Sequence, residues 1–230
     1  MVLFLVIAES SLETVPEELW SDRNIRAHAA RLGKEPGDLL LDRSYHHRAM
    51  LRLAESHKRG RPDIIHASLL QALGSPLNKE GLLRMYVHTV RDYVIQVEPT
   101  VRIPKNYNRF VGLMEQLLKS GRVPLKGSPL LTMNRKSMSQ LLQEIRPSFV
   151  LALTREGEKA ELAKVISLAK GQTRFCVVVG GFPRGHFSLE TRRLADSLIC
   201  IDKESLETYV VVSRVIYAYE QVVGLPSKRL

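Results

Sequence analysis

The sequence is poor in cysteine and aromatic residues and has no long apolar run. Only two cysteines, Cys176 and Cys200, occur among the 230 residues, and each lies in a short apolar stretch. This excludes a disulfide-stapled fold and indicates buried thiols in a reducing cytoplasm. The apolar segment 1–8 is too short to span a membrane and lacks the basic start of a signal peptide. We therefore expect a cytoplasmic protein that does not enter a membrane.

Several catalytic motifs are also missing. The seven histidines have neither nearby paired cysteines nor the H-E-x-x-H spacing, so no metal site is expected. No G-x-S-x-G motif occurs, which argues against a serine hydrolase of the α/β type. The glycine-rich segment 180–185 is not followed by Lys-Ser or Lys-Thr, which excludes a P-loop.

Positive charge is abundant and concentrated in one region. Lysine and arginine number 34 against 24 acidic residues, a net charge of +10. Between Pro99 and Gln143 only Glu115 opposes a set of eight bases, namely Arg102, Lys105, Arg109, Lys119, Arg122, Lys126, Arg135 and Lys136. Such an excess favours a nucleic-acid surface, although a solvated charged face is the alternative.

The hydrophobic pattern predicts an α/β fold. Apolar residues make up 44% of the chain, enough for a substantial core. Predicted strands cover 2–7, 39–42, 85–89, 94–97, 130–133, 149–153, 175–179 and 198–201. Of these, 85–89 and 94–97 form a hairpin or two adjacent strands. Predicted helices cover 22–32, a segment after Ser44, 62–73, 107–120, 137–144, 159–170 and 209–223. The last third alternates unpatterned apolar strands with helices, which predicts a parallel sheet covered on both faces with a ligand site at the strands' carboxyl ends.

The segment Gly180-Gly181-Phe182-Pro183-Arg184-Gly185 follows one of these strands. Its spacing differs from the G-x-G-x-x-G dinucleotide motif, and Pro183 lacks a backbone amide that could bind pyrophosphate. Asp202, after the next strand, leaves a nicotinamide nucleotide site open as one interpretation. An ordinary turn that needs positive φ is another.

Two polar clusters are candidates for substrate contacts. Arg61 and Asp63 lie two residues apart at a predicted helix start, where both can face one pocket; alternatively Asp63 caps the helix and pairs with an arginine. Lys105 and Arg109 lie four residues apart and share one helical face. Tyr107, between them, could stack on a base or pack into the core.

Taken together, six segments resemble one family in sequence and order. They are LDRSYHHRAM, RPDIIHASLLQALGSPLNKEG, YVHT, RIPKNYNRFVGLMEQLL, VVVGGFPRGHF and VVSRVIYAYE. This order is similar to that of the nucleolar-essential-protein family, small-subunit rRNA pseudouridine N1-methyltransferases of the SPOUT superfamily. The resemblance implies an S-adenosylmethionine cofactor, a homodimer, and a mostly parallel sheet with a carboxyl-terminal trefoil knot, an exception to the rule against threaded chains. It also implies a substrate pseudouridine in a small-subunit rRNA hairpin loop.

The resemblance also implies roles for particular residues. Arg61 and Asp63 correspond to catalytic residues at the target base, where Arg61 also binds RNA. Arg102, Lys105 and Arg109 correspond to an RNA-binding stretch, with Lys105 in a position where arginine is usual. The implied cofactor-binding residues are Leu153, Thr154, Gly180, Gly181, Gly185, Leu198, Cys200, Ile201 and Leu206. The third cofactor loop departs from the family pattern at residues 202–208.

The expected organisation is a single domain over residues 1–230. Residues 85–135 contain a basic RNA-binding extension, and residues 148–224 form the knotted, cofactor-binding part. The predicted function is methylation of rRNA during ribosome biogenesis. A non-catalytic RNA-binding assembly factor is the alternative, which the altered third loop favours.

Overall fold

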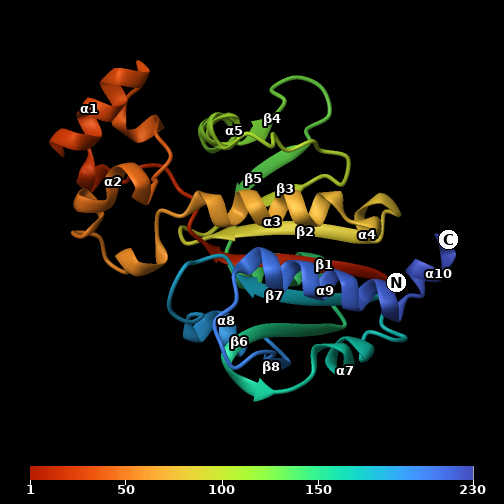
Figure 1. Cartoon of the computed structure of the whole chain (residues 1–230). Coiled ribbons are helices and arrows are strands. Elements are labelled where there is room, and N and C mark those ends of the chain that lie inside the picture. The colour runs from red at the N-terminus through yellow and green to blue at the C-terminus, as the bar shows by residue number, and fades with distance from the viewer. Residues whose placement is uncertain (230) are drawn as a thin grey trace.

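The computed structural model describes residues 1–229 and contains one eight-stranded sheet (Figure 1). Its strands are β1 (Val2–Ser10), β2 (Leu83–Thr89), β3 (Tyr93–Val97), β4 (Arg122–Val123), β5 (Leu131–Arg135), β6 (Phe149–Lys159), β7 (Arg174–Gly180) and β8 (Ser197–Cys200). The spatial order is β4-β5-β3-β2-β1-β7-β6-β8. The neighbouring strands β2, β1, β7, β6 and β8 run parallel to one another. On the other side of β2, β3, β5 and β4 extend the sheet with antiparallel pairing.

The helices begin and end at residues that suit those positions. They are α1 (Arg23–Leu32), α2 (Arg43–Met50), α3 (Pro62–Gly74), α4 (Pro76–Lys79), α5 (Tyr107–Ser120), α6 (Met138–Ile145), α7 (Leu162–Ser167), α8 (Leu189–Arg193), α9 (Thr208–Val222) and α10 (Leu225–Lys228). Asn106 caps α5 by accepting the backbone N–H of Arg109, and Gly121 ends it in the left-handed conformation. These two signals fix the helix that follows the basic stretch.

Helices cover both faces of the sheet. Along β1, Leu3, Leu5 and Ile7 point to one face, where they pack in a core with α3, α5, α7 and α9. The alternate residues Val6 and Ala8 point to the other face and pack in a core with α6. Because β1 is buried on both sides, its sequence is apolar without alternation.

A third core lies outside the sheet. Apolar residues between Val15 and Leu53 pack α1 against α2 and form a separate cluster. We call residues 15–53 the α1–α2 lobe. Figure 1 shows this lobe beside the N-terminal end of α3, at Pro62.

Most predicted elements are confirmed, including the β2–β3 hairpin and the helices on both faces. Two are wrong. Residues 39–42 form no strand, because Leu40 makes only one isolated bridge to Thr14 and the segment packs into the α1–α2 lobe. The predicted helix 159–170 is shortened to α7, because β6 continues to Lys159 by pairing a second time with β8.

In residues 1–229, no helix is both long and apolar enough to cross a membrane. The trefoil knot and the domain bounds implied by the resemblance stay predictions.

Candidate active site

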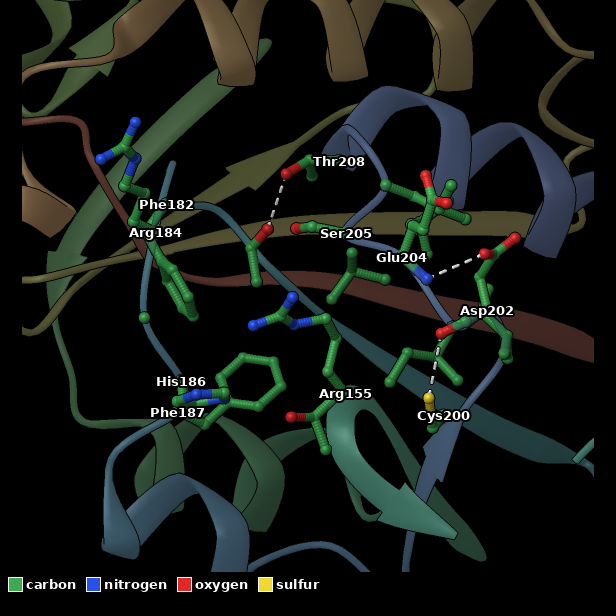
Figure 2. A pocket seen from close by; sticks show the side chains of 18 of the residues that line it. Arg155, Phe182, Arg184, His186, Phe187, Cys200, Asp202, Glu204, Ser205 and Thr208 are labelled. Atoms are coloured by element: carbon green, nitrogen blue, oxygen red, sulfur yellow. Dashed lines mark hydrogen bonds between the residues drawn. The ribbon is translucent and has the colours of Figure 1, made fainter. Parts of the chain in front are cut away.

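A cleft of about 370 Å³ opens at the carboxyl ends of β7 and β8 and beside a loop within β6. Because these strands are parallel, the loops that follow them meet at the same edge of the sheet. Figure 2 shows Phe182 and Phe187 on one side of the cleft, Cys200, Asp202 and Glu204 on the other, and Arg155 between them. The lining residues are Leu153, Thr154, Arg155, Val179, Gly180, Phe182, Pro183, Arg184, Gly185, His186, Phe187, Ile199, Cys200, Ile201, Asp202, Glu204, Ser205, Leu206, Thr208 and Val211.

The first loop is an excursion within β6. Leu153 and Glu158 both pair with Ile199, so the four residues between them leave the ladder and bring Thr154 and Arg155 to the cleft. The excursion returns close to β8: a Cβ on Gly157 would lie 2.5 Å from the backbone N of Ile199. Gly157 is therefore required by close packing.

The second loop begins with two glycines that have different surroundings. A Cβ on Gly180 would lie 2.9 Å from Cζ of Phe182, so glycine lets that ring fold against the end of β7. Gly181 instead packs on β1, because its N–H donates to the Ala8 carbonyl at 2.8 Å and its own carbonyl accepts the N–H of Ser11 at 2.9 Å. Phe182 and Phe187 pack edge to face, with ring centroids 5.7 Å apart.

The third loop is held by polar contacts. The Thr208 hydroxyl, at the start of α9, donates to the Gly180 carbonyl at 2.8 Å and so joins the second and third loops. The carboxylate of Asp202 accepts the backbone N–H of Glu204 at 3.1 Å and pairs with Arg214 at 3.3 Å. The Glu204 N–H and then Arg214 lower the pKa of Asp202 below its ordinary value. This carboxylate is thus already engaged within the loop.

A buried ion pair between Glu9 and Lys58 contacts the second loop. The Glu9 carboxylate accepts the N–H of Ser188 at 2.8 Å and pairs with Nζ of Lys58 at 3.2 Å. Burial acts to raise the pKa of Glu9, but the Ser188 N–H, the hydroxyls of Thr191 and Ser188 and the charge of Lys58 together hold it below its ordinary value. The Lys58 ammonium also lies 5.1 Å from the centre of the Phe182 ring. The segment before α3 is therefore tied to the second loop.

Arg61 and Asp63 form a bidentate pair at the start of α3. The guanidinium Nε and Nη2 donate to the two carboxylate oxygens at 2.8 and 2.7 Å. This hydrogen bonding to Asp63 raises the pKa of Arg61, against a smaller opposing effect of burial. The Asp63 side chain does not cap the helix, so only its pairing with an arginine is confirmed among the alternatives. The two side chains remain 37% and 46% exposed and can meet a substrate.

Arg102, Lys105 and Arg109 form an exposed set, which we call the basic ridge. In the described chain none of the three forms an ion pair. Tyr107 is half-buried: its hydroxyl donates to the Asp42 carboxylate, and its ring lies 6.4 Å from that of Phe110. Of the two alternatives for Tyr107, the structure supports packing against the core.

Comparisons with known proteins agree over nearly the whole chain. The family model described as EMG1/NEP1 methyltransferase matches residues 5–220. The chain belongs to the EMG1/NEP1 methyltransferase family. A ribosomal RNA small subunit methyltransferase Nep1 of Staphylothermus marinus is 44% identical over 96% of both chains. Another, from Pyrobaculum islandicum, is 47% identical over 97% of this chain and 100% of that protein.

A solved family member supports the fold. The crystal structure of Archaeoglobus fulgidus Nep1 bound to S-adenosylhomocysteine matches with a TM-score of 0.86 and 36% identity, covering 97% of this chain and 100% of that one. The mixed α/β architecture described above is thus the architecture of the EMG1/NEP1 family.

In this chain, the structure places some of the residues that the resemblance assigns to the cofactor in the cleft and others outside it. Leu153, Thr154, Gly180, Gly185, Cys200, Ile201 and Leu206 line the cleft, whereas Gly181 and Leu198 do not. Gly181 packs on β1, and Leu198 packs with the core on the α6 face. The cleft is also lined by Arg155, His186, Phe187, Thr208 and Val211, which the resemblance did not assign to the cofactor. His186, Phe187 and Val211 lie in segments that carry the family resemblance, and Arg155 directly follows the predicted Leu153-Thr154 pair.

Proposed function

We propose that the protein transfers a methyl group from S-adenosylmethionine to ring nitrogen one of a pseudouridine in a hairpin loop of small-subunit rRNA. The observation that carries this proposal is the cleft formed by the loops of β6, β7 and β8 in a chain that matches S-adenosylhomocysteine-bound Nep1 over 97% of its length. The same match favours S-adenosylmethionine over the nicotinamide nucleotide that Asp202 left open, since that carboxylate is engaged by Arg214 and Glu204.

The lining of the cleft fits this cofactor. Phe182 and Phe187 provide apolar surface, and the backbone of the second and third loops provides polar groups. The exposed Arg155 guanidinium, which has no ion-pair partner within residues 1–229, is suited to the cofactor's carboxylate. When bound, S-adenosylmethionine supplies a methyl group activated by its sulfonium.

The Arg61–Asp63 pair supplies the chemistry at the base. Nitrogen one must give up its proton, to solvent water, before or as it takes the methyl group, so negative charge develops on the uracil ring and its carbonyl oxygens. Arg61 stabilises that charge by facing a base carbonyl, and Asp63 fixes the plane of the guanidinium through its two hydrogen bonds. Because the pair is formed before RNA binds, little reorganisation is needed during the reaction.

The basic ridge binds the RNA backbone. The target base must leave its stacked position, which costs about a few kcal/mol, and phosphate contacts help to offset that cost. We also infer that the protein acts as a homodimer in ribosome biogenesis. Exposed Tyr209 and Tyr217 on α9 support a protein contact on that helix, which sedimentation analysis would test.

Methyl transfer to a synthetic hairpin tests the proposal. Incubation with labelled S-adenosylmethionine and mass spectrometry should give one methylated pseudouridine and no product on the matching uridine hairpin. Arg61→Ala and Asp63→Asn should each lower the rate by about 100-fold or more while the RNA still binds. Glu161→Gln, which removes an exposed carboxylate near α7, is the control and should leave the rate unchanged.

The same assay separates the non-catalytic alternative. The altered third loop favours a protein that clamps RNA without methylating it. Calorimetry that detects no S-adenosylmethionine binding, or RNA binding without any product, would support the clamp and contradict the enzyme. An unchanged rate in both Arg61→Ala and Asp63→Asn would refute the assigned roles alone.

A further inference from the structure

Tyr45 on α2 is a large aromatic side chain that lies on the surface. It is 53% exposed, whereas His46, Ala49 and Met50 of the same helix are buried. Its ring centroid lies 4.6 Å from that of His28 on α1, with the planes tilted by 32°. One face of the ring is thus supported by an imidazole, and the exposed remainder is available for contact.

The support under Tyr45 is fixed by a chain of hydrogen bonds. The Asp42 backbone N–H donates to Nδ1 of His46 at 3.1 Å, so the proton of His46 is on Nε2. That nitrogen lies 2.9 Å from Nδ1 of His28 and donates to it. Both imidazoles are therefore neutral and held in one tautomer, which keeps the surface beneath Tyr45 rigid.

Tyr45 is connected to the proposed RNA-binding residues. Asp42, which caps the same helix, accepts a hydrogen bond from Tyr107 in the first turn of α5, where the basic ridge ends at Arg109. The charge of Asp42 also acts on Arg61. Arg48, one turn after Tyr45, is exposed and has no carboxylate partner in the part of the chain that the structure describes. The exposed side of α2 thus carries a cation one turn from the exposed aromatic ring.

We propose that Tyr45 is a stacking platform for an unpaired base that flanks the target nucleotide. This inference rests on the proposed function, since it assigns part of the RNA contact. An RNA base is favoured over a protein side chain because the exposed cation Arg48 lies one turn away, and because the Tyr45 ring is 53% exposed rather than packed in a core. Tyr107, whose hydroxyl and ring are engaged inside the protein, does not serve this role.

Binding of the pseudouridine hairpin, measured by fluorescence anisotropy at several salt concentrations, tests the platform. Tyr45→Ala should weaken binding by about 5- to 150-fold, the range for loss of one base–aromatic stack. The salt slope should not change, because no charge is removed. Tyr45→Phe should bind like the wild type, and Tyr45→Leu should behave like Tyr45→Ala. Leu51→Ala, at an exposed position that follows α2, is the control and should bind normally.

Each outcome has a defined meaning. Normal RNA affinity of Tyr45→Ala and Tyr45→Leu, with the wild type still methylating the hairpin, overturns the platform and leaves the enzyme intact. A wild type that binds but does not methylate contradicts the proposed function instead. If Tyr45→Ala changes the sedimentation of the RNA-free protein, Tyr45 contacts a second copy of the chain and the platform is also overturned. Unchanged S-adenosylhomocysteine affinity in every variant verifies that each is folded.

Discussion

Replacing Lys58 by methionine should destabilise the protein through the carboxylate that it leaves behind. Methionine keeps most of the side chain's volume and removes the ammonium. The Lys58 and Glu9 side chains are each only 11% exposed, and their Nζ and Oε2 atoms lie 3.2 Å apart. Removing one partner of a buried pair costs about 3–5 kcal/mol, because the other charge stays buried.

The loss should lie at the low end of that range. Glu9 retains the N–H of Ser188 and nearby hydroxyls, which still stabilise its charged form. We therefore expect Lys58→Met to lower the free energy of unfolding by about 3 kcal/mol. For a chain of this size the melting temperature should fall by about 6–12 °C.

Differential scanning calorimetry at fixed protein concentration measures this effect. The double variant Glu9→Gln/Lys58→Met leaves no buried charge and should recover to within about 1 kcal/mol of the wild type. The control Lys164→Met breaks a pair whose lysine is 82% exposed, and should change stability by no more than about 0.5 kcal/mol. A melting temperature of Lys58→Met equal to that of the control would refute the reasoning, since the pair would then be solvated.

The remaining predictions concern pH and close packing. Burial, and then the charge of His28, lower the pKa of His46 to about 4. As pH falls from about 6.5 to 4, this imidazole therefore binds a proton in the unfolded chain but not in the folded one, and stability is lost. The loss should reach about 3 kcal/mol, followed by the fluorescence of Trp20 during urea unfolding, and His46→Gln should remove this pH dependence. Gly157→Ala should destabilise the cleft by about 1–3 kcal/mol because its Cβ would meet the β8 backbone 2.5 Å away, and should weaken S-adenosylhomocysteine binding in calorimetry. Gly112→Ala, in an exposed turn of α5 with open space around it, should instead stabilise by about 0.5–1 kcal/mol.

Local pattern identified most of the strands and helices. The apolar run of β1 is buried on both faces, and such a strand has the same sequence signature wherever it lies in a parallel sheet. The signature failed for residues 39–42, because a short apolar run also suits a segment packed among helices. It failed again after Glu158, where contact with β8 kept the chain extended against its helical preference.

The candidate site divides in the same way. The sequence by itself determined the charge excess, the position of α5 and the order of the strands along the chain, and through its resemblance to a family it pointed to Arg61, Asp63 and the three loops that line the cleft. Only the tertiary structure decided that Gly181 packs on β1 while Gly180 faces the cleft, because neighbouring glycines are alike in sequence and differ only in what surrounds them. It also decided that Glu9 and Lys58 are partners, since they lie 49 positions apart in the sequence and only the fold brings their side chains together.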